Sequence, residues 1–188
     1  MEVKRWKLFL DFEKEEAWLN NQVARGLAMI HYTFGRYTFE ECEPGEYIYR
    51  IELLKDSVTS PDNLRYLQFV EDSGAEHVDS YLNWVYFRKA TAEGPFDIYT
   101  DLESRIAHYQ RILKLYLLMV PLVLVGFISQ FISFISIAES GFQEIAAHLF
   151  VFSPLIPLVA VSILLYGRML PRLAKKVKLM KREQDIRE

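Results

Sequence analysis

Residues 29–53, MIHYTFGRYTFEECEPGEYIYRIEL, combine two alternating apolar segments with a turn and set the expected fold of the N-terminal part. Apolar side chains alternate over residues 29–40, and the parity changes near Gly35, as a bulge or bend in one strand requires. Residues 47–53 alternate in the same way. Pro44-Gly45 between them suits a tight turn, because proline presets φ and glycine adopts a positive φ. The stretch therefore predicts an antiparallel pair of strands.

Each side of this pair adds a helix and a further strand. Residues 6–10 are typical of a short strand, and the acidic residues that follow Asp11 open a helix. Ser60-Pro61 marks a second helix start, because serine is a good N-cap and proline favours the first helical position. Residues 75–78 and then residues 84–88 supply the last strand. This order predicts an α+β, ferredoxin-like cytoplasmic domain (βαββαβ), with one antiparallel sheet covered on one face by two helices.

Two long uncharged segments distinguish the C-terminal part. Residues 115–138 and 145–167 hold no formal charge, and at about 1.5 Å per residue each is long enough for a hydrocarbon core of about 30 Å. The connection, residues 139–144, is too short to cross back. The pattern predicts an α-helical transmembrane hairpin. A pair of soluble core helices is the competing interpretation, but such helices would lack a polar face for water.

Basic residues stand before the first uncharged segment and after the second, and the connection between the two segments holds none. By the positive-inside rule, this distribution predicts a multi-pass protein of the cytoplasmic membrane with both termini cytoplasmic. The N-terminus lacks the apolar region of a cleavable signal peptide. Topology alone explains the basic residues after the second segment, and contact with anionic lipid headgroups of the bilayer is the alternative. These residues are Arg168, Arg172, Lys175, Lys176, Lys178, Lys181 and Arg182.

The charge of the chain is divided unevenly. Its net charge is −3, but residues 1–104 carry 11 basic and 20 acidic side chains, a net charge of −9. Such an acidic domain disfavours direct binding of nucleic acid. The single cysteine, Cys42, excludes an intrachain disulfide framework. The expected organisation is a cytoplasmic domain (1–99), a stalk helix (100–114), two membrane helices (115–138 and 145–167) joined by an external loop (139–144), and a basic cytoplasmic tail (168–188).

Small residues recur at three- and four-residue intervals in the first uncharged segment. The spacing places them on one helix face, where small side chains let helices approach closely. Packing of the hairpin on itself is the main interpretation, and contact within a homo-oligomer is the alternative. The residues are Gly126, Ser129, Ser133 and Ser136.

Aromatic residues are the main candidates for a binding surface. The chain contains 3 Trp, 11 Tyr and 13 Phe, and rings on a sheet line ligand pockets and partner grooves as well as cores. Core packing is the simpler interpretation. The rings that we assign to a candidate partner or ligand surface are Trp6, Trp18, Tyr47, Tyr49, Trp84 and Tyr86.

Motifs of the known catalytic classes are not found. The four histidines are scattered without zinc-ligand spacing, and the chain has no glycine-rich phosphate loop and no nucleophile elbow. We therefore assign no catalytic residue, no metal site and no cofactor, and we expect that the protein is not an enzyme.

Several motifs resemble those of a bacterial domain-of-unknown-function family. The resemblance covers about residues 6–112. It implies a cytoplasmic domain followed by membrane helices, and family members that are often encoded beside PadR-type transcriptional repressors. It implies no active site. The motifs are Trp6-Lys-Leu-Phe9, Asp11-Phe-Glu-Lys-Glu-Glu-Ala-Trp-Leu-Asn20, Pro44-Gly-Glu-Tyr-Ile-Tyr-Arg50, Trp84-Val-Tyr-Phe-Arg-Lys89 and Phe96-Asp-Ile-Tyr-Thr-Asp101.

These observations lead to one functional hypothesis and two alternatives. The hypothesis is a membrane-anchored regulatory or sensory adaptor whose cytoplasmic domain binds a protein or a small ligand. The first alternative is an accessory subunit of a transport or export complex, in which the hairpin packs on a larger channel. The second is a membrane-bound enzyme.

Overall fold

The computed structural model describes residues 2–99, 101–140, 162 and 165–187. The chain divides into two compact units, Met1–His108 and Tyr109–Glu188, which we call unit 1 and unit 2. Unit 1 holds the strands and two helices of the described residues, and a long helix, α3, begins in it.

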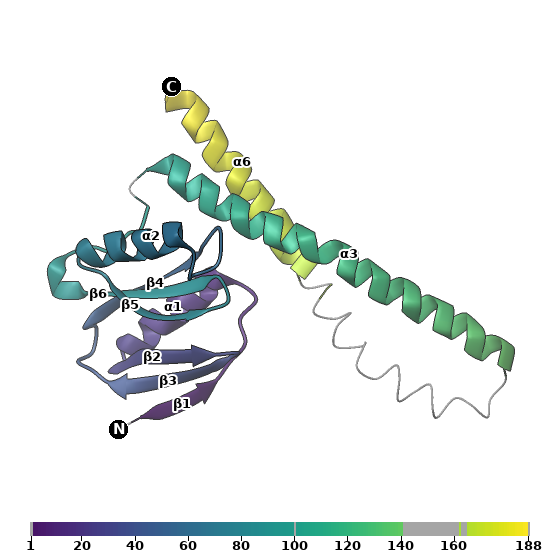
Figure 1. The fold of residues 1–188 in the computed structure, drawn as a ribbon, viewed down its shortest axis with the longest axis horizontal. Coiled ribbons are helices and arrows are strands. Elements are labelled where there is room, and N and C mark those ends of the chain that lie inside the picture. Colours follow the sequence, from purple (N-terminus) through teal and green to yellow (C-terminus); the bar gives the residue numbers. More distant parts are fainter. Residues whose placement is uncertain (1, 100, 141–161, 163–164, 188) are drawn as a thin grey trace. The chain divides into compact units, whose positions relative to one another are not determined.

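Within its described residues, unit 1 consists of two βαββ repeats that follow one another along the chain (Figure 1). In each repeat, a strand, a helix and a hairpin form a three-stranded antiparallel sheet. The strand order is β1-β3-β2 in the first repeat and β4-β6-β5 in the second, so both repeats have the same topology. The elements are β1 (Val3–Trp6), α1 (Phe12–Val23), β2 (Leu27–Thr33), β3 (Arg36–Glu41), β4 (Tyr47–Leu53), α2 (Pro61–Asp72), β5 (Glu76–Tyr81) and β6 (Trp84–Ala90).

The predicted ferredoxin-like sheet is wrong, because segments that we expected to be single strands form hairpins. The chain reverses at Phe34-Gly35 within residues 29–40, and it reverses again at Leu82-Asn83. The change of parity near Gly35 therefore marks a two-residue turn and not a bend in one strand. Such turns most often carry Asn-Gly or Asp-Gly, and neither turn of this chain gives that signal.

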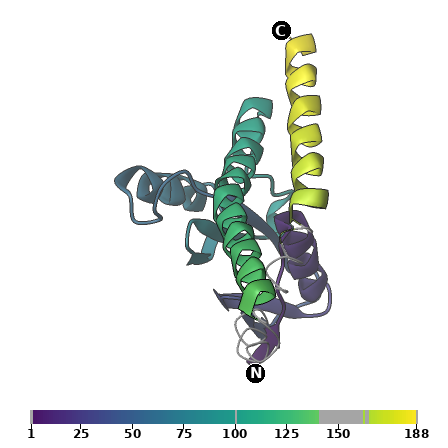
Figure 2. The same ribbon diagram turned by 90° about the vertical axis from the view of Figure 1, so that its right-hand side faces the viewer.

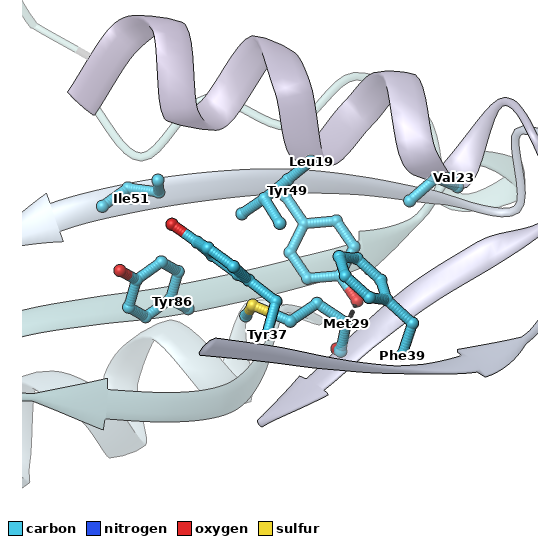
Figure 3. Close-up of a cluster of buried hydrophobic side chains, with 8 residues drawn as sticks. All are labelled: Leu19, Val23, Met29, Tyr37, Phe39, Tyr49, Ile51 and Tyr86. Carbon is cyan, nitrogen blue, oxygen red and sulfur yellow. Dashed lines mark hydrogen bonds between the residues drawn. The ribbon is translucent and has the colours of Figure 1, made fainter. Parts of the chain in front are cut away.

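The two sheets face each other across α1, and α2 covers the far face of sheet β4-β6-β5 (Figure 1). Successive side chains of β6 point to opposite faces of that sheet, and each face packs against a different helix. Val85 and Phe87 pack with α2, whereas Tyr86 points into the core around α1. The buried members of the core around α1 are Leu19, Val23, Met29, Tyr37, Phe39, Tyr49, Ile51 and Tyr86 (Figure 3).

Polar side chains of α1 complete the outer edge of β4. Asn20 accepts a hydrogen bond from the Tyr49 amide at 2.8 Å and donates one to the Tyr49 carbonyl at 3.2 Å. Glu16 accepts a hydrogen bond from the Ile51 amide at 3.1 Å. Because β4 is an edge strand, these backbone groups lack a neighbouring strand and need other partners. The contacts fix α1 to the outer edge of sheet β4-β6-β5.

Unit 2 contains most of α3 (Leu102–Ser140), a π-helical turn (Leu165–Met169) and α6 (Leu170–Arg187). α6 runs alongside α3 in the opposite direction (Figures 1 and 2). Lys176 of α6 donates a hydrogen bond to the Tyr109 hydroxyl at 2.7 Å, and its ammonium group lies 4.4 Å from the centre of the same ring. This cation–π contact joins the two helices.

The predicted transmembrane hairpin is corrected by the structure. Among the described residues, no helix is long and apolar enough to cross a membrane. Residues 115–138 form part of α3, whereas most of residues 145–167 lie outside the described part of the chain. The prediction relied on the absence of formal charge, but hydroxyl and amide side chains such as Ser129 and Gln130 also cost free energy in an apolar medium. The predicted multi-pass location with two cytoplasmic termini is overturned by the same finding.

Candidate functional site

A buried carboxyl group lies between the two sheets in the first turn of α1. Tyr37 of β3 and Tyr86 of β6 each donate a hydrogen bond to Glu15 Oε1, both at 2.7 Å. The two hydroxyl oxygens lie on the same side of the core cluster (Figure 3). One carboxyl oxygen therefore joins a strand of the first repeat to a strand of the second. Glu15 itself is only 8% exposed.

The surroundings of Glu15 favour its neutral form. Burial raises the pKa of Glu15 above its ordinary value of 4.5, and the hydrogen bonds from Tyr86 and Tyr37 oppose this shift. Burial, followed by the charge of Glu15, raises the pKa of both tyrosines, so both remain protonated donors. Among the described residues, no lysine, arginine or histidine forms an ion pair with Glu15.

Half-buried aromatic rings gather near this carboxyl group, at the end of unit 1 where α1 begins. The centre of the Tyr32 ring lies 5.2 Å from that of Tyr86 and 5.5 Å from that of Tyr81. The Trp84 ring lies 5.9 Å from the ring of Phe12. Tyr32, Tyr81 and Trp84 are all half-buried. We call this group the aromatic end, and its members are Phe12, Glu15, Tyr32, Tyr81 and Trp84.

Two hairpin tips carry exposed apolar side chains at the same end. Phe34, between β2 and β3, has a φ of 38°, and Leu82, between β5 and β6, has a φ of 56°. They are 64% and 75% exposed. Tyr32 stands two residues before Phe34 and Tyr81 directly before Leu82, and the contact between their rings places both tips at one end. A left-handed backbone costs about 1–2 kcal/mol for a residue with a side chain, and such strain clusters at functional contacts.

The two repeats meet at equivalent positions. His31 and Asp79 each stand three residues before the tip residue of their hairpin, and the distance between His31 Nδ1 and Asp79 Oδ2 is 2.7 Å. The same carboxylate oxygen accepts a hydrogen bond from the Tyr32 amide at 2.7 Å. In both hairpins the strand register shifts just before this position. The paired irregularities hold β2 beside β5 and bring the rings of the aromatic end together.

The six aromatic residues predicted as a binding surface do not form one surface. Trp84 belongs to the aromatic end, and Tyr86 lies beneath it as a partner of Glu15. Tyr49 is fully buried in the core, where its hydroxyl donates a hydrogen bond to the Met29 carbonyl at 2.7 Å. Two of the six residues thus lie at or beneath the aromatic end, whereas all but Trp6 belong to the core around α1 or pack against it.

The other three aromatic residues lie elsewhere in unit 1. Trp6 is exposed on β1, next to the first hairpin tip. Trp18 is half-buried on α1, and its ring packs edge-on against that of Tyr37, 4.8 Å between centres. Tyr47 lies at the opposite end of its sheet, with the Arg88 guanidinium 4.5 Å above its ring. A binding role for the six residues stays a prediction.

The basic C-terminal segment forms an amphipathic helix, α6. α6 buries Leu173, Val177 and Met180. The predicted contact with lipid headgroups stays a prediction. The predicted basic residues, all exposed, are Arg168, Arg172, Lys175, Lys176, Lys178, Lys181 and Arg182.

The stripe of small residues lies on α3. Ser129 is exposed and donates a hydrogen bond to the Gly126 carbonyl of its own helix at 2.9 Å. The side chains of Ser133 and Ser136 lie outside the described part of the chain. The predicted role of this stripe in helix packing or in a homo-oligomer stays a prediction.

Sequence reasoning missed Glu15 as a site residue. The run of acids after Asp11 predicts only a helix start, because acids in the first turn interact well with the helix dipole. A stronger signal was present, since Glu15, Leu19 and Val23 recur at intervals of four and share one face of α1. An acid on the apolar face of a helix indicates a buried carboxyl group.

The fold and the site define the class of this protein. It contains a tandem βαββ domain with a carboxyl group buried near aromatic rings, and a long helix begins in this domain. In the described residues, no group of three His, Cys, Asp or Glu side chains can hold a metal ion. The chain belongs to the family described as protein of unknown function (DUF2812), which matches residues 11–120. This confirms the predicted membership of a domain-of-unknown-function family. Comparison with curated proteins and with solved structures gave no match.

Proposed function

We propose that unit 1 is a ligand-binding domain with a regulatory or sensory role, and that it binds a small molecule at the aromatic end. The observation that carries the proposal is the convergence of half-buried rings near a buried carboxyl group. Small-molecule sites are mostly apolar, with a few polar groups that fix the orientation of the ligand. Core packing does not explain the exposed apolar side chains of Phe34 and Leu82 at this end.

The start of α3 supports a regulatory role, because it contacts the aromatic end within unit 1. The His108 ring lies 5.2 Å from the ring of Phe12 and 5.0 Å from that of Tyr99. Arg105 forms an ion pair with Asp97 at 2.6 Å. α3 then continues as one helix to Ser140. A ligand that displaces Phe12 shifts the first turns of α3, and a packed helix transmits such a shift along its length.

Calorimetric titration of the full chain with 2-naphthol, a neutral bicyclic aromatic compound, tests the proposal. Tyr81→Ala is expected to weaken binding at least fivefold, because it removes a ring that contacts Tyr32. Tyr47→Ala is the matched control, since Tyr47 is a half-buried tyrosine at the other end of the same sheet. The proposal fails if the wild type does not bind, or if the two variants lose equal affinity.

A protein partner is the second candidate, and the hairpin tips favour it. Phe34 and Leu82 have strained backbones and exposed side chains, as expected for residues that contact a partner protein. Members of the family that the chain resembles are often encoded beside PadR-type repressors, and a repressor of this type is the partner to test. Like the first candidate, this one assigns binding and no catalysis to the chain.

Size-exclusion chromatography of the full chain with that repressor distinguishes the second candidate. We expect the two proteins to elute together, and the double change Phe34→Ser and Leu82→Ser to separate them. Phe69→Ser is the control, because Phe69 is a similarly exposed apolar residue on α2. Separate elution of the wild-type proteins contradicts this candidate.

A further inference from the structure

The hydrogen-bond acceptor positions that remain on the Glu15 carboxyl group indicate which class of ligand the aromatic end binds. Both hydrogen bonds that Glu15 accepts within the described residues end on Oε1. A carboxylate has about four acceptor positions on its two oxygens. Oε2 can therefore accept a further donor or face a positive charge, while Tyr37 and Tyr86 hold the group in place.

Glu15 differs from Glu16 and Asp79, which have a cationic or an imidazole partner. The buried Glu52 instead accepts a hydrogen bond from the Tyr66 hydroxyl at 2.6 Å. Glu16, one residue further along α1, lies 3.2 Å from the Arg50 guanidinium. Asp79 lies 2.7 Å from His31. Buried carboxyl groups are usually paired, since the charged form is costly in an apolar medium. An added cation would supply the missing partner of Glu15.

The rings at the aromatic end suit a positive charge. Aromatic faces attract cations, and this chain uses that attraction elsewhere, with Arg88 over Tyr47 at 4.5 Å and Lys7 over Phe9 at 4.7 Å. The net charge of −9 on residues 1–104 draws cations toward this part of the chain. The dipole at the start of α1 favours the ionised form of Glu15 once a cation is beside it.

We propose that the ligand of the aromatic end is a small organic cation, and that Glu15 recognises its charge. This inference rests on the proposed function, because it names the class of ligand for the same site. Apolar rings or alkyl groups on the ligand would contact Tyr32, Tyr81 and Trp84. A metal ion fits less well, because it needs several ligands, and the described residues hold no group of three His, Cys, Asp or Glu that can supply them.

A purely structural role for Glu15 makes a different prediction. If its only task is to join Tyr37 to Tyr86, Glu15→Gln keeps an oxygen that accepts both hydrogen bonds and leaves binding unchanged. If Glu15 recognises charge, the same change removes the preference for a cation and leaves the affinity for a neutral ring in place. Glu13→Gln is the matched control, since Glu13 is an exposed acid in the same turn.

The experiment is a calorimetric titration of the full chain with three bicyclic aromatic compounds of similar size. They are N-methylquinolinium, a fixed cation, 2-naphthol, which is neutral, and 2-naphthoate, an anion. We expect the wild type to bind the cation at least tenfold more tightly than the neutral compound, and the anion least tightly. Glu15→Gln should weaken binding of the cation at least tenfold and change binding of 2-naphthol less than twofold, whereas Glu13→Gln should change neither.

The outcomes separate this inference from the function on which it rests. If the wild type binds 2-naphthol as tightly as N-methylquinolinium, the inference is overturned and the ligand-binding function stands. If Glu15→Gln keeps the preference for the cation, the inference is overturned as well. If the wild type binds none of the three compounds, both proposals fail. If Glu15→Gln does not fold, the affinities of the wild type for N-methylquinolinium and for 2-naphthol are enough to test the inference.

Discussion

The contact between α1 and the edge of β4 can be tested with Asn20→Ala. The side chain of Asn20 provides partners for both backbone groups of Tyr49, which is 0% exposed, so water cannot easily replace them. The Tyr49 carbonyl keeps a second donor, Arg50 Nη1 at 3.0 Å, whereas the Tyr49 amide loses the Asn20 oxygen that accepts its hydrogen bond. A buried donor without a partner costs about 1–3 kcal/mol. We therefore expect the free energy of unfolding to fall by about 2 kcal/mol.

Differential scanning calorimetry of the full chain measures this effect. For a chain of 188 residues, a loss of about 2 kcal/mol lowers Tm by about 4–8 °C. Asn21→Ala is the matched control, because Asn21 is the next residue of α1 and is exposed. It should change the free energy of unfolding by less than about 0.5 kcal/mol. If the two variants have the same Tm, α1 does not support the β4 edge as we describe.

Two further predictions concern the hairpin tip and the buried acid. Phe34→Gly should raise the free energy of unfolding by about 0.5–1 kcal/mol in a urea titration, because glycine adopts a positive φ without strain, and a loss of stability would contradict the strained turn. Burial raises the pKa of Glu15 above 4.5, so the stability of the wild type relative to Glu15→Gln should fall as the pH rises from 4.5 through the raised pKa, by at most about 1.4 kcal/mol per pH unit. Tyr32, Tyr37 and Tyr86 face Glu15, but their pKa values are raised above 10, so a rise of relative stability in this range would argue against a buried, neutral Glu15.

Local signals predicted the helices of unit 1 well. Asp11 accepts a hydrogen bond from the Glu13 amide and begins α1, and Ser60 accepts one from the Asn63 amide and begins α2, with Pro61 in the first turn. These signals depend on neighbouring residues, so they are visible in the sequence. The apolar face of α6 was predictable for the same reason.

The sheets and the site could not be predicted in the same way. The turn at Phe34-Gly35 lacks the usual residues, because a phenylalanine occupies a left-handed position that favours glycine or asparagine. Because the turn is not visible in the sequence, residues 29–40 are predicted as one long strand in place of a hairpin, and the tandem repeat is not recognised. The Glu15 site depends on Tyr37 and Tyr86, which are 22 and 71 residues away along the chain. Only the packing of the two repeats brings them together.

The central claim is that Glu15 and the rings beside it bind an organic cation. The most direct measurement is a crystal structure of the full chain with N-methylquinolinium bound. Our account predicts the charged nitrogen within about 4 Å of a Glu15 carboxylate oxygen, with the ring of the ligand against Tyr32, Tyr81 or Trp84. A ligand bound elsewhere on the chain, or bound at this end with its nitrogen turned away from Glu15, would contradict it.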